Sequence, residues 1–458
     1  GAIGAGVSVS VVNVSGDNAA ETGSVAVGAS GPVASFTAES VDDISVAGLG
    51  VSVAGGIGAI GGVVTLVSLS GTARATASPT GTVGSGGVSA VATGTRTVNA
   101  RTLNVTVGGL AVGLTVVRGN SSRHLESLVG GSVTTTGAVA SKATATNTVT
   151  VADPGVAIGG ITVGITVGFA VLGGHTLAQA TGTVVGASSV DVLATAANTA
   201  TTDTFLVNAS LVGLSGAWAS AVITSGAWIR AIVTAGASLG STGVITVKAA
   251  TAGLGNVAKG TVDAAGGGLV DIKAMVAIAR ISNEVRATLD GAITSAGRLD
   301  VLADAHNTAE ARVKTLAVAL VSLAIGAADA RIDGATRATG AGSIAASGAD
   351  LTVKATSVNH AIAFSNVITG GFLGGVAVSA PDATIGSPTA AQWDGAVTAG
   401  RNLTVEADAT NTADSTAKVL STGIASVTGA TAPATISNAT ITSATVGATA
   451  TITGLTAT

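Results

Sequence analysis

A motif that returns at regular intervals is the feature that most constrains what this chain can fold into. It reads aliphatic-x-Val-x-Ala, as in residues 299–303 (LDVLA) and 351–355 (LTVKA), and successive copies begin 51 to 55 residues apart. Such a period is typical of solenoids and other arrays, in which each repeat packs mainly on its neighbours. The first residues of the copies are Val33, Val88, Val139, Val190, Ile245, Leu299, Leu351, Leu403 and Leu455.

The repeat fills the whole sequence. We therefore expect residues 1–458 to form one continuous domain of about 8.5 tandem repeats rather than several globular domains. Solenoids need polar capping units at their ends, and neither end of this sequence has one. We accordingly expect the natural chain to be longer, so that this sequence is a fragment, or copies to join end to end.

Behind each motif, apolar and polar residues alternate. From Leu299 to Arg312 every second residue is Leu, Val, Ala or Asn, and most residues between them are polar or charged; Leu403 to Thr416 repeats the pattern. A period of two predicts a strand with one buried and one solvated face. Glycines separate these strands and permit the positive φ of tight corners. The predicted fold is all-β, a β-solenoid (β-helix) of repeats of about 52 residues with Gly-rich turns.

An asparagine recurs on the face that this alternation assigns to the interior. It lies eight residues after the first residue of the motif, and the repeat that starts at Ile245 has Gly253 there instead. A buried amide needs hydrogen-bond partners, and identical amides stacked on successive coils provide them. Exposed turn asparagines are the alternative interpretation. The residues predicted to form a structural ladder are Asn147, Asn198, Asn307, Asn359 and Asn411.

The composition limits both the core and the chemistry. The predicted buried face holds mainly Ala, Val, Ser and Gly, which predicts closely packed layers stabilised largely by backbone ladders and stacked pairs. With 20 Lys and Arg against 24 Asp and Glu, the chain has no excess of positive charge for binding nucleic acid. The absence of Cys excludes disulfides, thiolate metal sites and a Cys nucleophile. We expect no cofactor and no metal.

Two runs without charge, residues 44–69 and 155–174, are long enough to cross a bilayer. Both are rich in Gly with interspersed Ser and Thr, and neither has aromatic or basic anchors at its ends. Because the same apolar block recurs in each repeat, we interpret both runs as interior strands and expect no membrane-spanning segment.

Two alternatives to a structural role remain. Asp304 and Asp408 share one outward repeat position, and a pair of carboxylates about 5–10 Å apart would suit a carbohydrate-cleaving β-helix. No aromatic platform for sugar lies near them in the sequence. Outward threonines suggest ice binding as the second alternative, although threonine does not recur at the same positions in every repeat. These residues are Thr404, Thr410, Thr412 and Thr416. We expect all four histidines to be solvated surface side chains; they are His124, His175, His306 and His360.

Residues 297–311 (GRLDVLADAHNTAEA) and 400–415 (GRNLTVEADATNTADS), with GAVTAG before the second, resemble repeats of very large bacterial surface proteins. These are the filamentous-haemagglutinin-like and related β-strand-repeat adhesins. The resemblance covers essentially the whole chain, although the short-coil members have coils of only about 20 residues. It implies export, a β-helical rod, and a role in adhesion, matrix or filament building. No site residues carry over.

Together these observations predict a structural protein of the extracellular space or cell surface, without enzymatic activity. We expect a fibre- or stalk-forming region that self-associates into filaments or end to end, with a cell-surface or glycan ligand as a further partner. A carbohydrate-binding or carbohydrate-cleaving β-helix and an ice-binding solenoid are the alternatives. If one repeat is one coil, the rod is about 40 Å long, and two coils would double this.

Overall fold

The computed structural model describes residues 3–21, 25–27, 34–54 and 57–453, so the motif copies at Val33 and Leu455 lie outside the described residues. Nearly all of this part is β-strand, with one short 3-10 helix, η1 (Ser225–Ala227). Across these residues no helix has the length and apolar character needed to cross a membrane.

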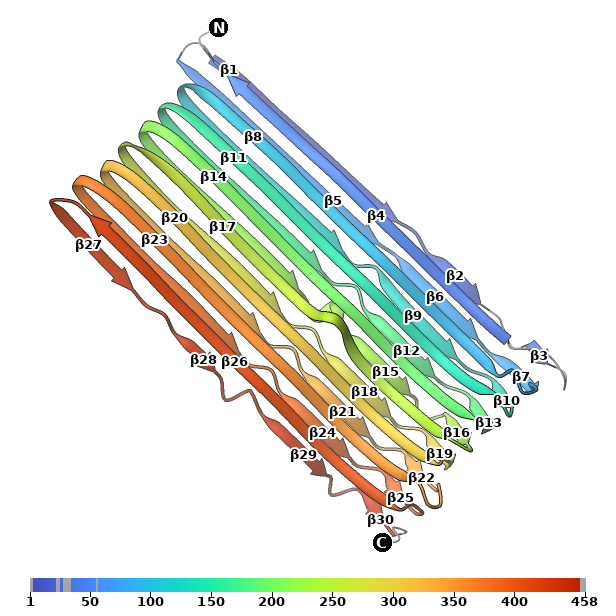
Figure 1. The fold of residues 1–458 in the computed structure, drawn as a ribbon. Coiled ribbons are helices and arrows are strands. Elements are labelled where there is room, and N and C mark those ends of the chain that lie inside the picture. The colour runs from blue at the N-terminus through green and yellow to red at the C-terminus, as the bar shows by residue number, and fades with distance from the viewer. Residues whose placement is uncertain (1–2, 22–24, 28–33, 55–56, 454–458) are drawn as a thin grey trace.

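The strands form three parallel sheets (Figure 1). The first sheet has twelve strands: β1 (Ile3–Ser15), β4 (Ala34–Val53), β5 (Gly58–Ser70), β8 (Val88–Ser121), β11 (Ala138–Leu172), β14 (Ser189–Ile223), β17 (Val244–Ile281), β20 (Arg298–Ile332), β23 (Asp350–Ile385), β26 (Asn402–Thr422), β27 (Ala425–Ala430) and β28 (Ala434–Ile436). The second has nine: β2 (Asn18–Glu21), β6 (Thr72–Ala77), β9 (His124–Val129), β12 (Thr176–Ala180), β15 (Ile229–Val233), β18 (Val285–Leu289), β21 (Thr336–Gly340), β24 (Thr389–Trp393) and β29 (Thr442–Val446). The third also has nine: β3 (Val25–Val27), β7 (Pro79–Thr82), β10 (Ser132–Thr134), β13 (Thr183–Ala187), β16 (Ser238–Ser241), β19 (Ala292–Ser295), β22 (Ser343–Ile344), β25 (Ala396–Val397) and β30 (Thr451–Ile452).

One repeat forms one coil. In the first sheet Leu299 lies beside Leu351, and Leu351 beside Leu403, so each motif pairs with the same motif of the next repeat. The same register joins Val139 to Val190. The prediction of an all-β solenoid is therefore confirmed, with one coil per repeat.

Each coil is flattened into two layers. In β20 the chain runs outward from residue 298, turns at a register irregularity between Ala319 and Val321, and returns to residue 332. β21 and β22 then complete the second layer, and the turns gather at one end of the molecule while the third sheet lies at the other (Figure 1). We call the part of each coil within about seven residues of this turn the wing, and the remainder the base.

The flattening changes the expected shape. A layer of about 22 residues spans about 70 Å, whereas eight coils stacked about 4.8 Å apart span about 40 Å. The described part is therefore a slab that is wider than it is long along its axis, instead of the thin rod that the repeat count predicted. Hydrogen bonds join the layers; for example, the Thr202 hydroxyl donates to the Ser220 carbonyl oxygen at 2.9 Å.

The base has a conventional apolar core between the start of the long strands and the second and third sheets. Leu125, Ile229, Ile245 and Leu299 belong to this cluster, and each is at most 1% exposed. The predicted alternation is confirmed there, since Leu299, Val301 and Ala303 are buried and His306 is exposed.

Trp393 shows how the core of the base accommodates a large ring among small neighbours. Its side chain is completely buried, in line with Gly340 of the preceding coil. A Cβ atom at Gly340 would collide with the indole ring, so glycine there makes room for the tryptophan.

The wing reverses this arrangement. In β11, Thr162 and Thr166 point inward and are 1% exposed, whereas Ile161 and Ile165 point outward and are 51% and 42% exposed. The layers approach closely here: a Cβ atom at Gly155 would lie 2.7 Å from the Thr166 hydroxyl oxygen. Close layers favour small side chains over much of this interior, although Leu206 and Met275 are also buried there.

The interpretation of residues 44–69 and 155–174 as interior strands needs a correction. Their described residues do form strands, and large apolar side chains far from the turn, such as Leu69 and Leu172, are buried as expected. Many of those near the turn face outward instead; Val53 is 65% exposed and Ile158 is 43% exposed. Alternation in the sequence separates two faces without saying which is inside, because small Thr and Gly suit a narrow interior better than Ile or Leu.

Candidate functional site

A continuous ladder of asparagine side chains runs through the stack and includes all five predicted residues. Each amide donates from Nδ2 to the Oδ1 atom of the next coil, at 2.8 or 2.9 Å, and all except Asn411 are at most 4% exposed. The donor and acceptor order is Asn147, Asn198, Asn256, Asn307, Asn359 and Asn411.

The expected interruption at Gly253 does not occur, because Asn256 fills that rung. Ala250 pairs with Asp304 but Asn256 pairs with Asn307, so residues 251–255 form a bulge that loops out of register. Gly253 and Gly255 adopt positive φ values of 57° and 83°, which a bulge of this kind requires. The bulge restores the asparagine to its place, which counting from the motif could not foresee.

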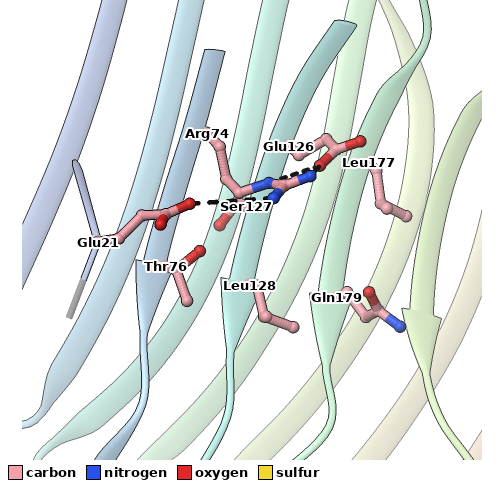
Figure 2. A pocket seen from close by; sticks show the side chains of 8 residues that line it. All are labelled: Glu21, Arg74, Thr76, Glu126, Ser127, Leu128, Leu177 and Gln179. Atoms are coloured by element: carbon pink, nitrogen blue, oxygen red, sulfur yellow. Dashed lines mark hydrogen bonds and ion pairs between the residues drawn. The ribbon is translucent and has the colours of Figure 1, made fainter. Parts of the chain in front are cut away.

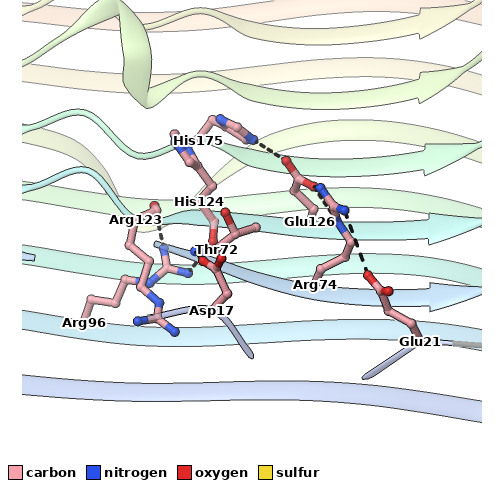
Figure 3. Close-up of polar contacts among 9 residues, drawn as sticks. All are labelled: Asp17, Glu21, Thr72, Arg74, Arg96, Arg123, His124, Glu126 and His175. Atoms are coloured by element: carbon pink, nitrogen blue, oxygen red, sulfur yellow. Dashed lines mark hydrogen bonds and ion pairs between the residues drawn. The ribbon is translucent and has the colours of Figure 1, made fainter. Parts of the chain in front are cut away.

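Arg96 begins the ladder. It occupies the asparagine position of the preceding coil, is 1% exposed, and donates from Nη1 to Asn147 Oδ1 at 3.1 Å and to the Arg123 carbonyl oxygen at 3.2 Å. Burial, and then the nearby Arg123 charge, lower the pKa of Arg96 to about 10, while Asp42 opposes this shift. A second buried cation, Arg123, lies 3.4 Å from Asp42, and Figure 3 shows the side chains of Arg96 and Arg123 close together.

A second stack lies near the outer face of the second sheet. The rings of His124 and His175 are 4.0 Å apart, and His175 lies 4.0 Å from Trp228 with an angle of 3° between the planes. The Arg230 guanidinium covers the other side of Trp228, 4.5 Å from the ring centre. Burial, with the adjacent His175, lowers the pKa of His124, so this ring is neutral at pH 7.

A chain of ion pairs accompanies the rings. Arg74 lies 2.5 Å from Glu126 and 3.9 Å from Glu21, and Glu126 also hydrogen-bonds His175 at 3.0 Å (Figure 3). The hydrogen bond from His175, and then that from Arg74, lower the pKa of Glu126 to about 2 despite its partial burial. The expectation that all four histidines are freely solvated is therefore wrong for His124 and His175. Their equal offsets within their repeats were the signal that could have revealed the stack.

A surface hollow with a volume of about 480 Å³ lies beside this chain of ion pairs (Figure 2). Its lining residues are Glu21, Arg74, Thr76, Glu126, Ser127, Leu128, Leu177 and Gln179. Both carboxylates face Arg74 across it, so this one guanidinium is already shared between them. The Trp228 ring nearby is covered by His175 and Arg230, and no aromatic residue lines this hollow, so it offers no ring on which a sugar could stack.

The residues considered for other chemistry do not converge. Asp304 and Asp408 lie two coils apart in register, with Thr356 between them. Lys354 lies 2.9 Å from Asp408, and this hydrogen bond lowers the pKa of that carboxyl, opposite to the shift that a general acid needs. Within the described ranges no group of three His, Asp or Glu side chains could hold a metal ion.

The outward threonines do not form an array. Thr410 lies beside Val358, and Thr416 beside Phe364.

Comparison with known proteins found no match: no protein-family model, no curated protein and no solved structure matches this chain.

The ladder predicts a graded response to amide removal. Asn307→Ala should lower the free energy of unfolding by about 3 kcal/mol, because it leaves one donor and one acceptor buried without partners. Asn411→Ala removes a single bond at a half-buried site and should cost about 1 kcal/mol. Thermal unfolding of both variants measures the difference, and equal effects would contradict the ladder.

The low pKa of Glu126 predicts a pH dependence. A carboxyl whose pKa falls from 4.5 to about 2 on folding stabilises the folded state above pH 4.5, and this contribution disappears as the pH falls towards 2. We expect Glu126→Gln to lower the free energy of unfolding by about 2 kcal/mol at pH 7 and to leave it almost unchanged at pH 2. Glu21→Gln is the control, since that side chain is 48% exposed and 3.9 Å from Arg74. A deficit that persists at pH 2 would refute this role.

Proposed function

We propose that this chain is a structural segment of an extracellular or cell-surface scaffold, a fibre- or stalk-forming region like the repeats of the bacterial adhesins that it resembles. The observation that carries the proposal is the stacking of one coil per repeat in register, joined by a buried amide ladder. Such a stack grows by adding equivalent coils, which suits a molecule that must be long.

Side-chain contacts between successive coils support this role. Arg230 lies 2.6 Å from Glu284, and Lys354 lies 2.8 Å from Glu406, each pair joining one coil to the next. A single exposed pair contributes about 0–1 kcal/mol. Combined with buried amides that bond only in the correct register, the pairs oppose sliding of one coil along its neighbour.

A catalytic role has less support. The carboxylates at Glu126 and Asp408 are held ionised by basic neighbours, and the hollow beside Arg74 offers no aromatic surface for a glycan. An extracellular location is supported by the resemblance to exported adhesins and by the absence of Cys, which spares the chain thiol oxidation.

Growth of the stack would continue from the last coil. In the second sheet the first inward residue of each strand donates its N–H to the next coil: Thr336 to Pro388 at 2.9 Å and Thr389 to Ile441 at 2.8 Å. Thr442 holds the equivalent position in β29, the last strand of that sheet among the described residues. Its N–H is therefore oriented to pair with a further coil, from the same chain or a second copy.

We expect the purified chain to form stacks longer than one molecule as its concentration rises, visible by electron microscopy and by sedimentation. Thr442→Pro should stay folded but assemble less, because it removes only the donor that points to a further coil. A chain that sediments as a monomer at the highest concentration reached would exclude assembly through this end.

A further inference from the structure

The wing carries an apolar surface on both faces and around its turn. Large aliphatic or aromatic side chains occupy the turn of one coil after another, with exposures between 44% and 71%. They include Ile161, Leu211, Leu269, Val321 and Phe372. Outward residues on the two adjoining faces are also apolar, such as Ile158 and Ile165 in β11. Soluble monomers rarely expose a continuous apolar surface of this extent.

Charged residues border this surface without entering most of it. In β8 no charge lies between Arg101 on one face and Arg118 on the other, and in the sequence none lies between His360 and Asp382. Lys314, about six residues from its turn, is among the cations that lie nearest, and a long lysine side chain can reach outward from such a position.

Aromatic side chains lie at this border. Phe205 is 47% exposed and Trp218 is 40% exposed, on the outgoing and returning arms of β14. Aromatic residues between an apolar zone and a charged one are typical of proteins at membrane–water interfaces.

The interior of the wing is polar. Asn208 hydrogen-bonds Ser215 at 2.8 Å, and the buried Lys273 and Asp271 form an ion pair at 3.1 Å. In the base, aliphatic side chains fill the interior instead. The wing therefore buries several polar groups in its interior while many of its aliphatic side chains face outward.

The size of the surface discriminates between occupants. Six residues of depth by seven coils give about 20 Å by 34 Å, or about 700 Å² on each face. A stable dimer buries about 800 Å² on each partner, so a second copy could cover one face but would leave the other face and the turns exposed. Lipid acyl chains would cover both faces and the turns at once. The apolar surface of the wing is about 20 Å deep, and one leaflet contains roughly 15 Å of hydrocarbon, so an inserted wing would reach past the middle of the bilayer.

We propose that the wing inserts edge-on into the hydrocarbon of a lipid bilayer, with the base and its charged side chains outside. The backbone groups of the wing hydrogen-bond to neighbouring coils, so the inserted faces present side chains to the lipid. The first and last described coils each have a backbone edge that further coils of the proposed scaffold would pair, so in this respect the inference rests on that proposed function; flotation and sedimentation test the two separately.

The test is flotation of the full chain with vesicles of neutral phosphatidylcholine, which offer hydrocarbon without charge attraction. We expect the chain to float with the vesicles, and Val212→Asp, Val318→Asp and Val321→Asp together to lower the partition coefficient at least tenfold. The matched control makes the same change at three exposed valines of the base, Val185, Val244 and Val358, and should bind like the unmodified chain.

Fluorescence reports where the contact occurs. Brominated lipids should quench Trp218 at the wing border, and Trp218→Phe should remove the quenched component while Trp228 and Trp393, in the base, stay unquenched. The proposal would be overturned if the unmodified chain did not float, or if the base variant lost as much vesicle binding as the wing variant. It would also be overturned if the unmodified chain self-associated, the wing variant did not, and neither of them bound vesicles. Circular dichroism of both triple variants verifies that they remain folded.

Discussion

The structure depends on a single constraint, the pairing of each coil with the next in parallel register through backbone hydrogen bonds. Once Leu299 lies beside Leu351, residues at equal repeat positions lie about 4.8 Å apart. Side chains that attract their own kind are then favoured: amides bond in a chain from Asn147 to Asn411, and the rings of His124, His175 and Trp228 stack. Like charges also share a repeat position, since Arg230 lies beside Arg286, and there Arg230 is compensated by Glu284, which is displaced by two residues on the next coil.

The two halves of a coil meet this constraint with opposite side-chain arrangements. In the base, Leu, Ile and Val fill a wide interior, and charged residues cover the outside. In the wing, the layers lie close together, so small side chains such as Thr and Gly line much of the interior, with a few larger ones such as Leu206 and Met275, while many Ile, Leu and Phe side chains face outward. The asparagine ladder lies between the two main apolar clusters, where the second layer passes from the first sheet to the second.

The sequence predicted the fold class, the repeat positions and the inward face of the base, because these follow from a period of two within a period of about 52. It also predicted five asparagines of the ladder. It missed Asn256, because a bulge at residues 251–255 shifts the count. The inversion of the wing was missed because alternation does not reveal how far apart two layers lie. The stack of His124 on His175 follows from the equal offsets of these two residues within their repeats, which the type of residue alone does not reveal.

The register of neighbouring coils can be measured directly, since the chain has no native Cys. Thr308 pairs with His360, so Thr308→Cys with His360→Cys brings two thiols to adjacent positions, about 4.8 Å apart between Cα atoms, within disulfide range. His306→Cys with His360→Cys displaces the pair by two residues, beyond that range. We predict rapid intramolecular oxidation of the first pair and little of the second. Equal oxidation of both pairs, or faster oxidation of the second, would contradict stacking in register.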